Sequence, residues 1–325
     1  MEPSPPEQPL DTVLVVAPTA PHSVAPPAPV PAAPPRVWTA FLALAAYLVG
    51  SLVAGAVVAA AVIFPLARQR GAAPGPEELG AALASPPLLL GSVLVQLALT
   101  VGLSLVAASL SRERLAARLA LRRAAVGAGA LALASLGLLL CGAVVQEAVR
   151  ALGIPMTGSL AQLERVLRGL SPGAFVVALA VGGVLVPIGE ELFFRGYVQS
   201  RLCRRWGTWP GIAWTALFFA LAHLDPIHSA SALVAGIYLG WVAQRTGSTV
   251  PGIVVHAVNN VVAIATGWAL PDPDVSRATH VALLGASLAG AVAVLAWLAR
   301  RLPRAAVAAV PAQDPGAEDA AHPAG

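Results

Sequence analysis

The stretch "PGAFVVALAVGGVLVPIGEELFFRGYVQSRL", from Pro172 to Leu202, decides the fold class. Its first fifteen residues carry no charge and no strongly polar side chain. Glu190 and Glu191 then stand side by side near the end of the apolar run, and Arg195 follows. Apolar runs of this kind are typical of membrane helices, in which charged side chains are costly. The sequence therefore predicts a membrane span whose charged residues have a role other than solubility.

The composition of the whole chain agrees with a membrane protein. Hydrophobic residues make up 57% of the chain and charged residues 11%, whereas a soluble domain carries about 25% charge. The mean hydropathy is +0.77. We predict an all-α polytopic membrane protein with about eight transmembrane helices and a cavity between the later ones. The candidate spans are Val37–Phe64, Leu88–Ala108, Ala124–Val145, Pro172–Gly189, Trp209–Ala222, Ser229–Val242, Gly252–Leu270 and Val281–Leu298.

The fifth and sixth candidate spans are short, and the tight connection "HLDPIH" joins them. Each is therefore interpreted either as a full span or as a partly re-entrant one. The expected division of the chain is a disordered Pro/Ala-rich cytoplasmic tail (1–35), N-terminal transmembrane helices (36–171), a catalytic core (172–270), a last transmembrane helix (271–302) and a disordered C-terminal tail (303–325). The first segment has no basic region followed by an apolar region, so it does not resemble a signal peptide.

The distribution of positive charge predicts the orientation in the membrane. All twenty basic residues are arginines, and the net charge is +4. Fourteen of them fall on the side of the predicted spans that holds both termini. The positive-inside rule therefore places both termini in the cytoplasm, in a multi-pass protein of the cell membrane. Because the arginines lie between apolar runs, we expect membrane lipid as a partner and no nucleic acid. The exclusive use of arginine indicates a GC-rich bacterial genome and hence a bacterial inner membrane.

Three short motifs place polar side chains on successive predicted spans. The first is Glu-Glu-x-x-x-Arg at Glu190, Glu191 and Arg195. Residues four apart share a helix face, so Glu191 and Arg195 are expected to pair. Glu190 lies about 100° around the helix and is left available for proton transfer. Pro187 removes a backbone donor one turn earlier and is expected to loosen the helix there.

The other two motifs are Phe219-x-x-x-His223 and His256-x-x-x-Asn260. If the chain turns back at Gly207, Glu190 and His223 return to nearly the same depth. His256 lies so early in its span that a tilt, or a short re-entrant sixth span, is needed to bring it to that depth. With Asn260, one turn later, it is expected to face a common cavity.

Structural interpretations remain open for each of these groups. In a structural interpretation, Glu191 and Arg195 form an ion pair that only stabilises the fold. His256 and Asn260 would likewise only form hydrogen bonds between helices. His223 taken alone is a helix-end histidine. Asp225 and His228 are interpreted as turn residues around Pro226, Phe219 as a packing residue, and Glu147 as a residue at a membrane boundary. Cys141 and Cys203 show no metal or redox spacing and are interpreted as packing residues.

The ordered set of motifs resembles the CPBP family, which comprises CAAX prenyl endopeptidases and bacteriocin-processing (Abi) membrane proteins. The resemblance covers roughly residues 172–267, and all three motifs match. It implies peptide-bond hydrolysis inside the membrane, with Glu190 and His223 activating a water molecule. It also implies that His256 and Asn260 stabilise the oxyanion. Eukaryotic members trim the last three residues of prenylated proteins, whereas many bacterial members have other or unknown substrates.

The sequence leaves the metal question and the function class open. Glu190, His223 and His256 would make a His₂Glu set of the kind found in catalytic zinc sites. However, no H-E-x-x-H helix occurs, and Asn260 suits an oxyanion better than zinc. We therefore favour a mechanism without a cofactor and keep zinc as the alternative. A proton-coupled transporter would be expected to show internal repeats, and none is visible. A non-catalytic scaffold or bacteriocin-immunity protein that binds a partner peptide is the other alternative.

Overall fold

The computed structural model describes residues 36–83, 85–110, 114–155, 158–270 and 275–303. The regular structure in these ranges is entirely helical, as predicted. Seven of the helices there are long and apolar enough to cross a membrane. They are α1 (Trp38–Arg70), α3 (Pro86–Ser109), α5 (Ala128–Ala151), the uninterrupted helix from Pro172 to Trp206, α11 (Pro226–Thr246), α12 (Val250–Ala269) and α13 (Arg277–Arg301).

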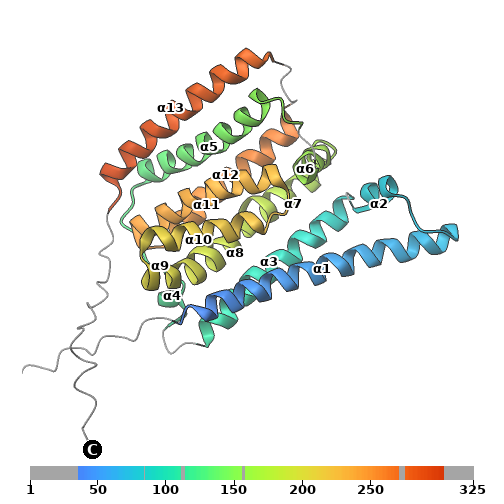
Figure 1. Ribbon diagram of the computed structural model, residues 1–325, viewed down its shortest axis with the longest axis horizontal. Helices are drawn as coiled ribbons and strands as arrows, with labels where there is room; N and C mark the ends of the chain where they lie inside the picture. The colour runs from blue at the N-terminus through green and yellow to red at the C-terminus, as the bar shows by residue number, and fades with distance from the viewer. Residues whose placement is uncertain (1–35, 84, 111–113, 156–157, 271–274, 304–325) are drawn as a thin grey trace, which may run out of the picture. The chain divides into compact units, whose positions relative to one another are not determined.

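Four shorter helices complete the described part of the chain: α2 (Pro76–Leu83), α4 (Leu115–Arg118), α6 (Gly158–Arg168) and α10 (Thr208–Leu221). The long helices run side by side (Figure 1). Large apolar side chains project outward from them, such as Leu52 and Val57 on α1, which are 65% and 62% exposed. Hydrocarbon is the solvent that stabilises a surface of this kind, so these side chains mark lipid-facing helix faces.

The predicted short spans differ from each other in length. The fifth, α10, is a short helix of 14 residues. The sixth, α11, runs for 21 residues, so the expectation that it is short is wrong. The expected turn is confirmed: Trp206 ends one helix, Gly207 has φ +91°, and α10 begins at Thr208. Because α10 and α11 form one hairpin, both of its outer ends return to the same end of the bundle (Figure 1).

The helix from Pro172 to Trp206 contains two stretches of π-helix around the paired glutamates. It consists of α7 (Pro172–Ala178), η1 (Leu179–Leu185), α8 (Val186–Glu191), η2 (Leu192–Gln199) and α9 (Ser200–Trp206). π-Helical turns are rare and occur mostly at functional sites. Pro187 lacks the N–H that an α-helix would use, and the wide turns of η1 lie directly before it. The loosening expected there is thus a change of helix type.

The turn before α12 explains the depth of His256. Thr249 Oγ1 donates a hydrogen bond of 2.8 Å to the Leu119 carbonyl. The same carbonyl packs on Gly196 of η2, where an added Cβ would lie 2.9 Å from it. The segment after α4 therefore holds the start of α12 level with Gly196, only one turn beyond Glu191. His256 reaches the glutamates because α12 begins deep in the bundle, and no short sixth span is needed.

Small residues bring the helices around the site close together, as is common in membrane proteins. A Cβ at Gly211 of α10 would lie 2.5 Å from the backbone nitrogen of Cys203. A Cβ at Gly236 of α11 would lie 2.9 Å from the Cβ of Ala216. The α9–α10–α11 arrangement thus depends on the absence of side chains at these two positions.

On another flank of the bundle, α5 and α13 pack along their whole lengths. Glu147 of α5 is buried there and its Oε2 lies 2.7 Å from Nδ1 of His280. Glu147 is therefore a buried partner in a helix–helix contact one turn from the end of α5, and its interpretation as a residue at a membrane boundary stays a prediction.

Candidate active site

Glu191 and Arg195 form a buried ion pair within one helix. Arg195 Nη1 donates to Glu191 Oε1 at 2.8 Å, and both side chains are 0% exposed. The pairing expected from their spacing is confirmed. Arg195 also donates from Nη2 to the Gly236 carbonyl at 3.3 Å, and its Cζ lies 4.6 Å from the centroid of the Phe219 ring. The pair therefore links η2 to both α10 and α11.

His256 lies between the two glutamates. Its Nδ1 is 3.0 Å from Glu191 Oε1, and its Nε2 is 3.8 Å from Glu190 Oε2. A carboxylate oxygen accepts, so Nδ1 carries the hydrogen and donates to Glu191. Such a bond fixes the orientation of the ring, here with Nε2 toward Glu190. The side chain of Glu190 is 17% exposed while that of Glu191 is 0% exposed. Of the two carboxylates, only Glu190 is open to an incoming molecule.

Gly252 of α12 permits this arrangement. A Cβ at that position would lie 3.0 Å from Glu191 Oε2, so any side chain there would press on the carboxylate. Glu191 Oε2 is itself buried and has no hydrogen-bond partner among the residues that the structure describes. The carboxylate is thus held through Oε1 alone, which Arg195 and His256 share.

His223 lies directly beyond α10, beside the same group of residues. Its Nδ1 is 2.8 Å from the Phe219 carbonyl. A carbonyl accepts, so Nδ1 donates and Nε2 is left as a proton acceptor. The Phe219 ring lies 4.9 Å from the His223 ring and 6.1 Å from the His256 ring, centroid to centroid. These contacts bring His223 to the depth of the glutamates, as predicted from the length of the α9–α10 hairpin.

No direct hydrogen bond joins Glu190 and His223 within the described ranges. The turn after His223 has the expected role, because Asp225 accepts a hydrogen bond of 2.9 Å from the His228 backbone N–H and caps α11. The His228 ring nevertheless lies 4.3 Å from the His223 ring, centroid to centroid.

Asn260 lies one turn after His256 and faces the same long helix, whereas the common cavity expected for the two side chains stays a prediction. Its Nδ2 donates to the Gly182 carbonyl of η1 at 3.2 Å. Its Oδ1 accepts from Asn259 Nδ2 at 3.3 Å. An asparagine amide has two N–H donors, so one is left for a further acceptor. The carboxamide is thus held at both ends while one donor stays available.

The three sequence motifs do not include Tyr47 of α1, which the structure places near them. Its side chain is 5% exposed, and its ring lies 5.4 Å and 5.8 Å from the rings of Phe193 and Phe194, centroid to centroid. Its hydroxyl is close enough to Glu190 for an electrostatic interaction. The signal that was available is helical spacing, because Ala40, Ala43, Leu44 and Tyr47 form the buried stripe of α1.

The described residues do not present a ready metal site. In ranges 36–83, 85–110, 114–155, 158–270 and 275–303, no three His, Cys, Asp or Glu side chains are grouped closely enough to hold a metal ion. Glu190, His223 and His256 do not fit a zinc ion as they are arranged. The chemistry below is therefore derived from the side chains alone.

A comparison with protein families matches residues 172–262 to the family described as Type II CAAX prenyl endopeptidase Rce1-like. The matched range contains all three motifs, from Glu190 to Asn260. Residues 172–262 are thus similar to the Rce1-like family. The resemblance drawn from the motifs is confirmed over this segment, and the chain is a multi-pass membrane protein. No curated protein and no solved structure matches the chain. Tyr47 lies outside the Rce1-like segment, so the site includes a helix that the family model does not cover.

Proposed function

We propose that this chain is an intramembrane endopeptidase that hydrolyses a peptide bond of a membrane-associated or lipidated protein or peptide. The position of His256 is the observation that supports this most. One ring nitrogen is bonded to the buried Glu191 and the other faces the accessible Glu190. A protonated His256 together with Glu190, Glu191 and Arg195 forms a group with no net charge, which lowers the cost of placing them in a membrane.

In this proposal Glu190 and His223 activate a water molecule between them. Glu190 takes a proton from the water, and the Nε2 lone pair of His223 accepts a hydrogen bond that orients it. The hydroxide oxygen attacks the carbonyl carbon of the substrate. The side chain of Glu190 is 17% exposed, which gives the water access.

The oxyanion that forms would be stabilised by α12. The free amide N–H of Asn260 and the Nε2–H of a protonated His256 are the two donors, held by Gly182 and Glu191 respectively. One such donor in other hydrolases contributes about 3–4 kcal/mol to the transition state. Collapse of the intermediate breaks the C–N bond, and the proton held by Glu190 passes to the leaving amine. A carboxylic acid and an amine leave the site, and Glu190 returns to its starting state.

Location and substrate follow from the same proposal. The arginine-rich end of the bundle would face the cytoplasm, and both termini would lie there. The protein would reside in a bacterial inner membrane. The Rce1-like description of the family supports a protein or peptide substrate in contact with lipid, of which a prenylated protein is one case.

The experiment that tests the function compares membrane-proteome fragments from three strains. One produces the wild-type chain, one produces Glu190→Ala, and one lacks the protein. We expect new peptide termini only with the wild-type chain. A partner that binds both forms and is cut in neither strain would instead support the scaffold alternative.

A further inference from the structure

An apolar hollow lies on the opposite side of α11 from the glutamates. It has a volume of about 400 Å³, within the range of small-ligand sites. Cys141 of α5 contributes to its lining, with Ile237 and Trp241 of α11 and Ala299 of α13 around it. The carbonyls of Gly236 and Gly240 of α11 accept hydrogen bonds from Arg195 and Gln199 of η2, and neither glycine lines the hollow. The hollow is therefore separate from the proposed catalytic site.

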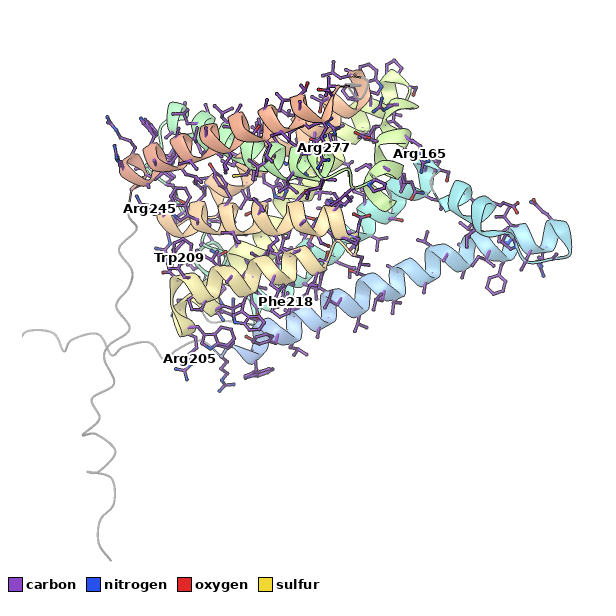
Figure 2. All side chains as sticks on the ribbon, turned by 45° about the horizontal axis from the view of Figure 1, so that its top comes forward. Arg165, Arg205, Trp209, Phe218, Arg245 and Arg277 are labelled. Carbon is purple, nitrogen blue, oxygen red and sulfur yellow. The ribbon has the colours of Figure 1, made fainter. Side chains whose placement is uncertain are left out.

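The hollow lies at the arginine-rich end of the bundle. Trp209, in the first turn of α10, lines it and is 63% exposed. In Figure 2, Trp209 and Arg245 lie toward the same end, away from Arg165 and Arg277. Tryptophan is enriched where hydrocarbon meets lipid headgroups. The hollow therefore opens where an acyl chain joins its headgroup.

Three arginines belong to the ends of α11 and α13 that line the hollow, although none of them lines it directly. Arg245 Nη2 donates hydrogen bonds to the carbonyls of Ala299 and Leu302, and its Cζ lies 5.9 Å from the centroid of the Trp241 ring. Its Nε is buried and has no acceptor among the residues described. Arg300 and Arg301 follow Ala299 directly and are exposed. Basic groups between membrane helices at such an end favour anionic headgroups.

We propose that this hollow, between α5, α10, α11 and α13, is a binding site for an anionic phospholipid. One acyl chain lies in the apolar hollow, and the phosphate is placed beside Arg245, Arg300 and Arg301. The apolar lining and the charged opening together require both parts of a lipid. Free phosphate lacks the acyl chain, and the ammonium group of a zwitterionic lipid offsets the negative charge that attracts the arginines, so an anionic lipid is favoured. The site does not depend on the proposed peptidase activity.

The test is native mass spectrometry of the full-length protein titrated with phosphatidylglycerol, phosphatidylcholine or inorganic phosphate. We expect retention of one phosphatidylglycerol in preference to phosphatidylcholine. Each arginine near an anionic surface contributes about 1 kcal/mol, so Arg300→Gln with Arg301→Gln should weaken binding by about tenfold or more. Arg165→Gln with Arg168→Gln removes the same charge at the other end and should leave binding unchanged.

A second variant tests the apolar part. Ile237→Trp fills the hollow and should abolish lipid retention while the thermal midpoint stays near that of the wild type. If this variant does not fold, the two arginine pairs still decide the matter. Equal retention of both lipids, competition by inorganic phosphate alone, or a second protein copy in place of the lipid would overturn the proposal.

Discussion

At the residue scale, two adjacent glutamates have the same chemistry and different surroundings. Glu191 is fully buried and shared by Arg195 and His256, whereas Glu190 is partly exposed and faces the Nε2 side of His256. The sequence allowed the pairing of Glu191 with Arg195 to be predicted, because helical spacing dictates it. It did not reveal that His256 bonds to Glu191, because the two residues lie 65 positions apart in the sequence, on different helices.

The two glutamates should therefore respond differently to substitution. Glu190→Gln should abolish cleavage and leave the protein folded, because a partly exposed amide replaces the carboxylate at little structural cost. Glu191→Gln should destabilise the protein by about 3–5 kcal/mol, because it leaves the buried Arg195 without its counter-charge. Thermal unfolding in detergent, measured beside cleavage, checks both. A stable Glu191→Gln protein without activity, beside an active Glu190→Gln protein, would reverse the assignment.

Tyr47 should affect the reaction through its hydroxyl. Tyr47→Phe keeps the ring contacts with Phe193 and Phe194 and removes the group that interacts with Glu190. We expect kcat to fall by about tenfold with KM and thermal stability nearly unchanged. The matched control is Tyr238→Phe, whose hydroxyl bonds to the Ala134 carbonyl away from the site. Equal kcat values for wild type and Tyr47→Phe would show that the hydroxyl has no part in the reaction.

At the element scale, the α9–α10 hairpin and the start of α12 bring the three motifs together. The hairpin was predictable, because a glycine between two apolar segments is a local signal. The depth of α12 was not, since it depends on the tertiary contact between Thr249 and Leu119. The π-helical turns could not be predicted from the sequence either, because Pro187 indicates a weakened α-helix without specifying what replaces it.

The close contact within the hairpin gives a prediction at this scale. Gly211→Ala places a methyl group against the backbone of Cys203 and should separate α10 from α9. Overpacking of this kind costs about 1–3 kcal/mol, and the shift of His223 should lower cleavage as well. Gly142→Ala is the control, because nothing lies within 4 Å of its added Cβ. Unfolding midpoints and cleavage rates of the two variants give the answer, and identical behaviour would contradict the packing account.

At the scale of the whole molecule, the orientation proposed for the chain rests on the distribution of its arginines. The start of α1 and the end of α13 lie at the same end of the bundle (Figure 1). The arginine-bearing helix α9 and the end of α11 lie there as well. Among the described residues, the seven helices long enough to cross a membrane and the shorter α10 correspond to the eight predicted spans. The predicted span count thus led to the same relative placement of the two ends.

This orientation is open to a direct test. In a background of Cys141→Ala and Cys203→Ala, a single cysteine at position 2 or 320 should resist a membrane-impermeant thiol reagent in intact cells. It should react once the inner membrane is opened. A cysteine placed between α12 and α13 should show the opposite pattern. Labelling of position 2 or 320 in intact cells would place the termini outside the cytoplasm.

The central claim is that Glu190 and its neighbours hydrolyse peptide bonds without a metal ion. The most direct measurement combines peptide cleavage with metal analysis, using purified wild-type protein and Glu190→Gln in liposomes with a substrate found in the fragment comparison. We expect wild-type protein with less than stoichiometric metal to cleave fully in the presence of chelator, and Glu190→Gln to be inactive. One zinc ion per chain, lost with activity on chelation and restored with it, would contradict the account and make His223 and His256 metal ligands.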